Sequence, residues 1–199
     1  SIKRGTKMNE VKNIMIVGVG GQGALLASKT LGQVLLDSGF DVKVSEVHGM
    51  SQRGGSVVTY VRYGKKVYSP IVDKGQADFI VSFEMLEAAR YTEYLKTDGQ
   101  IVVNTQNIDP MPVITGAAEY PTNLQEKIQA ANIKIDALDC LTLAEQAGTS
   151  KAVNIVLMGR LSKYMDFPLE TWLQAIEKLV KPQFLEINKK AFLLGRGDN

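Results

Sequence analysis

Short apolar runs alternate along the chain with longer segments of helical periodicity. Residues 11–18 (VKNIMIVG) form an apolar, β-branched run that ends in glycine, which predicts a buried parallel strand. Residues 24–39 place apolar side chains at helical spacing and end in glycine, and residues 41–47 (DVKVSEV) again favour a strand. Together these segments predict a strand–helix–strand unit with a right-handed crossover.

The next segment departs from this rhythm, because no crossover helix follows the second strand. After the loop 48–55 (HGMSQRGG), residues 57–63 alternate at period two, and Gly64 and Lys65 can form a tight turn. Residues 56–72 therefore predict an antiparallel β-hairpin at a place where a helix is due.

The alternation returns after residue 76. Strands are expected in three apolar runs, at residues 77–83, 97–104 and 133–139. Helices are expected in five segments, at residues 84–95, 142–148, 150–165, 168–180 and 182–195. Residues 107–123 are the one long irregular loop, a kind of segment that often covers a site or an interface.

These elements predict an α/β fold: a Rossmann-like open, mostly parallel sheet with helices on both faces and an inserted antiparallel β-hairpin. We expect a single domain over residues 11–199. Residues 1–10 are expected to be a disordered N-terminus or an expression remnant, with Met8 as the natural start. The hairpin and the very apolar stretch 152–159 (AVNIVLMG) are candidates for contacts with a partner or with a second copy in a homodimer.

Composition narrows the classes of function. The chain has 199 residues, of which 45% are hydrophobic and 22% charged, and a formal net charge of +2, too small to predict binding to nucleic acid or an anionic membrane. No apolar run reaches the roughly 18 residues that a membrane helix needs. One cysteine, Cys140, and one histidine cannot make a disulfide, a four-cysteine iron–sulfur site or a typical zinc site. We therefore expect a cytoplasmic protein whose electron carriers, if any, sit on another chain.

Residues 18–23 (GVGGQG) have the G-x-G-x-x-G spacing of a dinucleotide-binding turn, placed between a strand and a helix. Gly18 permits the sharp exit from the strand, Gly20 lets the backbone approach a ligand, and Gly23 lets the helix pack on the strand. Gly21 and Gln22 complete the turn, and backbone N–H groups at the helix start favour a phosphate or carboxylate. A purely structural tight turn is the alternative.

Glu46 lies near the end of the second strand, where a dehydrogenase holds the ribose hydroxyls of NAD. Alternatively, Glu46 orients the following loop by binding Arg53 or backbone amides. The missing crossover helix makes NAD the less favoured interpretation. Glu84 and Asn104 follow two later strands at the same sheet edge, where either ligand binding or helix capping would explain them.

The loop after the second strand is the most unusual segment. It carries four polar side chains in a short span: His48, Ser51, Gln52 and Arg53. Gly54 and Gly55 let this loop approach a ligand or partner closely, and Arg53 can clamp a phosphate or carboxylate. The alternative is a glycine-rich turn with a solvated arginine, and His48, a candidate general base, is as a lone histidine more often structural.

Five stretches together resemble the gamma-type subunit of the 2-oxoacid:ferredoxin oxidoreductases, and they lie at residues 18–23, 45–57, 77–90, 153–161 and 186–195. The resemblance runs from about Val11 to Gly195, and HGMSQRGG is its most specific motif. The length and residues 188–195 (NKKAFLLG) look most like the beta subunit of the indolepyruvate type. The gamma subunits of the pyruvate and 2-ketoisovalerate types are close relatives.

The resemblance implies a role inside a complex. Such enzymes decarboxylate a 2-oxoacid on thiamine diphosphate with Mg, pass two electrons through [4Fe–4S] clusters to ferredoxin, and release an acyl-coenzyme A. It implies that a larger alpha subunit carries the thiamine diphosphate and the clusters and meets ferredoxin. This chain is then expected to hold no cofactor tightly, to be inactive alone, to complete the active site and to admit coenzyme A.

The same resemblance makes two segments candidate ligand-edge or interface elements: the glycine turn (Gly18, Gly20, Gly21, Gln22, Gly23) and the loop Gln52-Arg53-Gly54-Gly55. It assigns no catalytic residue and no metal ligand to this chain. An independent NAD(P)-dependent oxidoreductase and a stand-alone NAD(P)- or coenzyme A-binding module remain the alternatives of another class.

Overall fold

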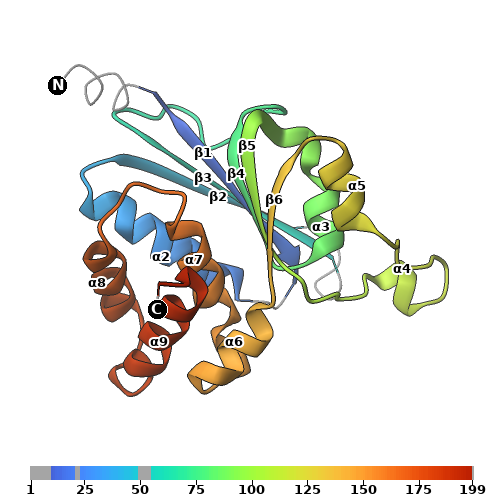
Figure 1. Ribbon diagram of the computed structural model, residues 1–199. Helices are drawn as coiled ribbons and strands as arrows, with labels where there is room; N and C mark the ends of the chain where they lie inside the picture. The colour runs from blue at the N-terminus through green and yellow to red at the C-terminus, as the bar shows by residue number, and fades with distance from the viewer. Residues whose placement is uncertain (1–9, 21–22, 49–54, 199) are drawn as a thin grey trace.

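Strand β1 (Lys12–Val19) is buried on both faces of a sheet. Successive side chains of a strand point to opposite faces, so Ile14 and Ile16 enter one hydrophobic core while Met15 and Val17 enter the other. Each core needs a covering layer, and helices lie on both faces of the sheet (Figure 1). The computed structural model describes residues 10–20, 23–48 and 55–198.

Within those residues the sheet has six strands in the order β2-β3-β1-β4-β5-β6. Strand β3 is antiparallel to both β2 and β1, whereas β1–β4, β4–β5 and β5–β6 are parallel pairs. One strand therefore runs against the others, which confirms the open, mostly parallel α/β sheet expected from the sequence. The remaining strands are β2 (Asp41–His48), β3 (Ser56–Gly64), β4 (Ala77–Ser82), β5 (Leu95–Asn104) and β6 (Lys134–Leu138).

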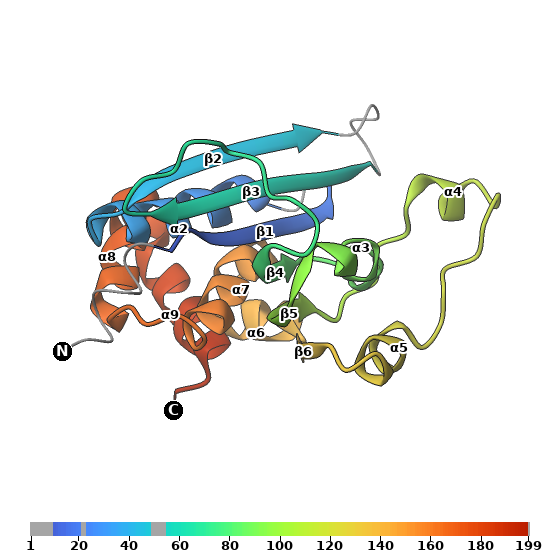
Figure 2. The same cartoon turned by 90° about the horizontal axis from the view of Figure 1, so that it is seen from above.

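Two helical layers enclose this sheet (Figures 1 and 2). One layer contains α2 (Ala24–Asp37), α6 (Cys140–Ala147), η2 (Ser150–Ala152), α7 (Val153–Ser162), α8 (Leu169–Leu179), η3 (Pro182–Phe184) and α9 (Leu185–Arg196). The other contains α3 (Met85–Arg90), η1 (Thr92–Tyr94) and α5 (Leu124–Ala130). The larger core lies under the first layer, where Trp172 and Phe192 are fully buried with ring centroids 5.6 Å apart.

Helix α7 packs backbone to backbone against α9. A side chain at Gly159 would overlap the carbonyl oxygen of Phe192, and one at Gly195 would overlap that of Val156. Only glycine permits so close an approach. The apolar stretch 152–159, a candidate subunit contact from the sequence, is instead buried inside the chain.

The antiparallel hairpin has a different location from the expected one. Its strands are β2 and β3, paired in a register that places Val44 opposite Val61, and no strand forms over residues 65–76. The reason is that β1 and β2 already occupy both edges of β3, so β3 has no free edge with which a following strand could form the expected hairpin. The segment after Gly64 is held as coil instead, for example by the N–H of Val67, which donates to Asp41 Oδ2 over 2.8 Å.

Residues 105–123, which we call the arm, project from the body of the domain at the right of Figures 1 and 2. The arm contains the short helix α4 (Met111–Ile114), whose Met111 and Ile114 side chains are exposed. The sequence indicates an irregular loop here, and that interpretation holds except for this one turn. Helix α5, which follows the arm, has no counterpart among the elements expected from the sequence.

Candidate functional site

The carboxyl ends of β1, β4, β5 and β6 meet at one edge of the sheet, the edge at which open α/β sheets bind ligands. Strand β1 delivers the glycine turn to this edge. Gly18 lies in β1 opposite Val57, Gly20 follows the strand, and Gly23 precedes α2. Gly21 and Gln22 lie outside the described residues.

Gly23 has the left-handed backbone conformation, with φ of 83°, which favours glycine. Its carbonyl oxygen accepts a hydrogen bond from Asn154 Nδ2 over 3.3 Å, so the start of α7 braces the start of α2. A Cβ on Gly23 would lie 2.8 Å from the same Nδ2 atom. The left-handed backbone and the contact with Asn154 of α7 explain the third glycine of the motif, and its expected role in packing the helix on the strand stays a prediction.

The two glycine motifs of the sequence meet at this edge. The backbone N–H of Gly20 donates to the carbonyl oxygen of Gly55 over 3.1 Å. This contact exists because β3 runs antiparallel to β1, which places the beginning of β3 beside the end of β1. Four further candidates from the same loop lie outside the described residues: Ser51, Gln52, Arg53 and Gly54.

Glu46 does not lie beside the glycine turn. It pairs with Thr59 of β3, and Thr59 in turn pairs with Ile16 of β1, so β3 separates Glu46 from the strand that carries the turn. Two strand spacings amount to roughly 9–10 Å. In a dinucleotide fold the corresponding acidic residue stands on the strand next to the turn. The strand order therefore argues against NAD binding in the usual geometry.

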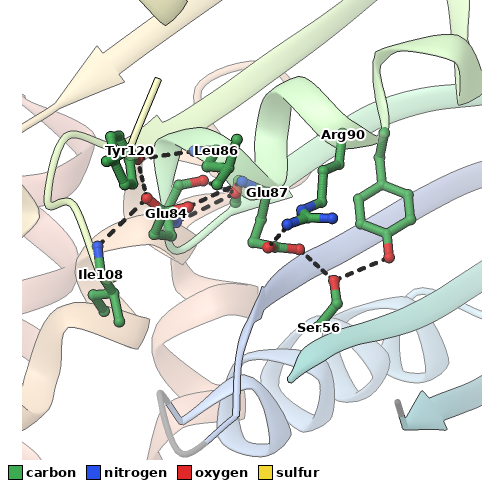
Figure 3. Close-up of polar contacts among 9 residues, drawn as sticks. Ser56, Glu84, Leu86, Glu87, Arg90, Ile108 and Tyr120 are labelled. Atoms are coloured by element: carbon green, nitrogen blue, oxygen red, sulfur yellow. Dashed lines mark hydrogen bonds and ion pairs between the residues drawn. The ribbon is translucent and has the colours of Figure 1, made fainter. Parts of the chain in front are cut away.

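Ser56, the residue after Gly55, is held by a buried carboxylate of α3 (Figure 3). Its hydroxyl donates to Glu87 Oε2 and lies 3.0 Å from the hydroxyl of Tyr91. Glu87 is 2% exposed and forms an ion pair with Arg90, whose Nε lies 3.1 Å from Glu87 Oε1. Burial raises the pKa of the Glu87 carboxyl, although the Ser56 hydrogen bond and Arg90 oppose the shift.

A second buried carboxylate, Glu84, lies one turn before Glu87. Its Oε2 accepts from the backbone N–H of Glu87 over 3.0 Å and caps α3, so capping, one of the two alternatives for Glu84, is observed. Its Oε1 accepts from the Tyr120 hydroxyl and from the N–H of Ile108, 3.4 Å away (Figure 3). Glu84 therefore clamps both ends of the arm to α3. Burial and the neighbouring Glu84 carboxylate raise the pKa of Tyr120.

Asn104 joins the ends of three strands. Its Oδ1 accepts from the N–H of Cys140 over 3.1 Å, at the first turn of α6 after β6. Its Nδ2 donates to the carbonyl oxygen of Phe83, at the end of β4, over 3.4 Å. The side chain is fully buried. Asn104 thus satisfies backbone groups of its neighbours, which leaves a structural role for it.

An open pocket of about 490 Å³ lies at this edge beside Gly23. Its lining comes from the end of β4, the first residues of the arm and the starts of α2, α6, η2 and α7, and consists of Gly23, Phe83, Gln106, Ile108, Leu141, Ser150, Lys151 and Val153. Lys151 is the cation of this lining. The pocket therefore combines apolar walls with one positive charge, a composition suited to part of a ligand that carries an anionic group.

The described residues do not fit a metal or an iron–sulfur cluster. Among them, no three histidine, cysteine or acidic side chains gather in a way that could hold a metal ion. Cys140, the one cysteine of the sequence, is fully buried, and burial raises the pKa of its thiol. A [4Fe–4S] cluster, which usually takes four cysteine ligands, thus finds no ligand set in this part of the chain. Within the same part, no helix is long and apolar enough to cross a membrane.

Four residues of this edge escaped sequence reasoning: Ser56, Glu87, Tyr120 and Asn154. Ser56 directly continues the glycine-rich loop, so its position was a usable signal. Glu87 and Asn154 fall inside helical patterns, where polar residues ordinarily face water, and their burial depends on tertiary packing.

Residues 13–197 match the family model described as Pyruvate ferredoxin/flavodoxin oxidoreductase. A similar curated relative is the indolepyruvate oxidoreductase subunit IorB of Thermococcus kodakarensis, 46% identical over 188 residues, which cover 92% of this chain and 93% of the relative.

Two solved structures share the fold. The pyruvate oxidoreductase subunit PORC from Thermotoga maritima has a TM-score of 0.71 and 24% identity, and the match covers 95% of this chain and 97% of that one. The 2-oxoglutarate:ferredoxin oxidoreductase from Magnetococcus marinus, solved with 2-oxoglutarate, coenzyme A and succinyl-coenzyme A bound, has a TM-score of 0.70 and 17% identity. That match covers 95% of this chain and 31% of the other.

Proposed function

The chain belongs to the pyruvate ferredoxin/flavodoxin oxidoreductase family, and on this premise we propose that it is the small subunit of an indolepyruvate (arylpyruvate):ferredoxin oxidoreductase. At the coarser level it is a subunit of a 2-oxoacid:ferredoxin oxidoreductase. The observation that carries the finer proposal is the 46% identity to an indolepyruvate oxidoreductase subunit over nearly the whole of both chains. Identity to the pyruvate oxidoreductase subunit of the same fold is 24%.

In the proposed reaction, a 2-oxoacid and coenzyme A give an acyl-coenzyme A, CO₂ and a proton, while two electrons reduce two ferredoxins. Complexes of this family use thiamine diphosphate and iron–sulfur clusters. We assign those groups to a larger partner subunit, because this sequence has one cysteine, which is buried, and its described residues gather no metal ligands. This chain then contributes a binding surface rather than the redox groups.

The surface that we assign to this role is the sheet edge where the glycine turn meets Gly55. The Gly20 N–H is already used by Gly55, so it is not free for a ligand. The backbone N–H groups at the start of α2 are better candidates, since no side chain among the described residues caps this helix. Phosphates are the ligands that such helix starts favour, and coenzyme A supplies them. Lys151 adds a positive charge to the adjoining pocket.

Two consequences of the proposal concern the complex. The chain is expected to be inactive alone, because it completes an active site whose reacting groups lie on the partner. The complex is expected in the cytoplasm, where a ferredoxin is available and a free thiol stays reduced.

The test is reconstitution with the proposed larger subunit. Indolepyruvate- and coenzyme A-dependent reduction of ferredoxin should appear in the complex and be absent from this chain alone. Full activity of the larger subunit without this chain would contradict the proposal. A higher kcat/KM for pyruvate or 2-ketoisovalerate than for indolepyruvate would instead favour the gamma-subunit alternative.

Calorimetric titration with NAD⁺, NADP⁺ and coenzyme A addresses the alternatives of another class. Heat from a nicotinamide nucleotide at micromolar concentration would favour an independent oxidoreductase. We expect no heat from either nicotinamide nucleotide, because β3 lies between Glu46 and the glycine turn.

A further inference from the structure

The contact between Ser56 and Glu87 joins the glycine motifs to a buried charge. We propose that Glu87 is a positioning residue, which acts through Ser56 to hold the Gly55 end of the coenzyme A edge in place. This inference rests on the proposed function, since it concerns how the proposed binding edge is held. Nothing in the family resemblance or in the comparisons assigns a role to either side chain.

The path from Glu87 to the glycine turn is short. Glu87 Oε2 accepts from the Ser56 hydroxyl, Ser56 is bonded to Gly55, and the Gly55 carbonyl accepts from the Gly20 N–H over 3.1 Å. Ser56 is also the register partner of Val19, the last residue of β1. A displacement of Ser56 would therefore move Gly55 away from Gly20 and change the exit of the chain from β1.

The other end of the path is rigidly held. Glu87 N donates to Glu84 Oε2 over 3.0 Å, and Glu84 Oε1 accepts from Tyr120 of the arm (Figure 3). The first turn of α3 thus anchors the glycine motifs and the arm through two neighbouring carboxylates. Both carboxylates are almost completely buried.

Burying a charged carboxylate destabilises the folded state unless its contacts compensate for the lost hydration. Removing its charge from water costs free energy that an ion pair recovers only in part, and Arg90, the ion-pair partner of Glu87, is half-exposed. The like charge of Glu84 adds to this cost. In return, a hydrogen bond to a charged acceptor is stronger and more tightly aligned than a neutral one. The arrangement therefore favours precise placement of Ser56 over stability.

The test compares Ser56→Ala with Ser56→Thr in the reconstituted complex. Alanine removes the hydroxyl, whereas threonine keeps it and suits a strand. We expect Ser56→Ala to raise the KM for coenzyme A about ten-fold, because about this factor corresponds to the loss of one hydrogen bond to a charged group. The kcat should change less than about two-fold. Ser56→Thr should restore the wild-type KM, and Glu87→Gln should shift KM in the same direction as Ser56→Ala.

Two results would overturn the inference. One is a wild-type KM for coenzyme A in both Ser56→Ala and Glu87→Gln. The other is a fall in kcat and in complex assembly that follows the loss in Tm, since that would mean a purely structural role. Arg90→Gln is the matched control, because it removes the half-exposed ion pair and leaves the Ser56 contact in place.

A second measurement on the free full-length chain separates this inference from the proposed function. Amide hydrogen exchange at residues 18–20 and 55–57 should be about ten-fold faster in Ser56→Ala than in the wild type, and unchanged in Ser56→Thr. Equal exchange in all three proteins would overturn the inference even if the complex is active. An inactive wild-type complex with the expected exchange pattern would overturn the proposed function and leave this inference standing.

Discussion

The side-chain amide of Asn154 lies against the backbone of Gly23, 131 residues away in the chain, with Nδ2 3.3 Å from the carbonyl oxygen, and joins α7 to the start of α2. The contact fixes where α2 begins, directly after the glycine turn. A Cβ at Gly23, where the backbone is left-handed, would lie 2.8 Å from this Nδ2 atom, so the Asn154 side chain would have to shift.

Gly23→Ala should destabilise the chain by about 2–3 kcal/mol, through backbone strain and displacement of Asn154. Gly39→Ala is the matched control, because Gly39 has a similar φ of 88° but no atom near the position of a Cβ. It should cost only the strain, about 1–2 kcal/mol. Urea unfolding measures both. Equal losses in the two variants would show that Asn154 does not brace Gly23.

Gly159→Ala and Gly195→Ala should each cost about 3 kcal/mol or more, because a methyl group at either position overlaps a carbonyl oxygen of the facing helix. Gly32→Ala, in the middle of α2 with open space around its Cβ position, should instead stabilise the chain by about 0.5–1 kcal/mol. Thermal unfolding of the three variants tests both the expected losses at Gly159 and Gly195 and the expected gain at Gly32. A stable Gly159→Ala protein would contradict the backbone-to-backbone packing of α7 and α9.

Glu87 gives a prediction about pH. Burial raises the pKa of its carboxyl in the folded chain above the unfolded value near 4.5, so the folded state binds the proton more tightly than the unfolded state. The stability from this difference is fully present below the unfolded pKa and is lost as the pH rises through the folded pKa. Glu87→Gln removes that dependence. The unfolding free energy of the wild type should therefore fall relative to Glu87→Gln as the pH rises from about 4.5.

Urea unfolding of both proteins across this pH range checks the sign, since contributions from groups that do not interact with Glu87 cancel in the difference. A wild type that gains stability over Glu87→Gln with rising pH would mean that Arg90 and Ser56 outweigh burial.

Cys140 should react with a thiol reagent only when the chain opens. The thiol is fully buried, and burial raises its pKa, so both access and the thiolate are withheld in the folded state. Labelling with a chromogenic disulfide should be at least a hundred-fold slower than for a small thiol at the same pH, and denaturant should release one equivalent at once. Rapid labelling of the native chain would contradict the packing of α6 against α7 and α9.

The sequence predicted those parts of the fold that depend on local patterns. The run at residues 11–18 lacks alternation because β1 is buried on both faces, and that property is visible in the residues themselves. The position of the hairpin was not predictable in the same way. Residues 65–72 resemble a strand, but a hairpin with residues 56–64 needs a free edge of β3, and β1 and β2 occupy both edges of β3.

In the candidate site, too, local patterns predicted some features, while others depend on how the strands pair. The glycine turn lies between a strand and a helix, as its spacing predicts. Its contact with Gly55 follows from the reversed direction of β3, which no local pattern reveals. Ligand contacts by the predicted site residues stay a prediction, and Ser51, Gln52 and Arg53 lie outside the described residues.

The strand order also determines which strand can leave the sheet first in local unfolding. Within the described sheet, β2 pairs with β3 alone, so β2 is held in the sheet only while β3 is. An opening that frees β2 leaves the contact between Gly20 and Gly55 intact, whereas one that frees β3 breaks that contact and releases β2 as well. Strand β2 can therefore fray while the binding edge stays intact. The binding edge persists only as long as β3 remains paired in the sheet.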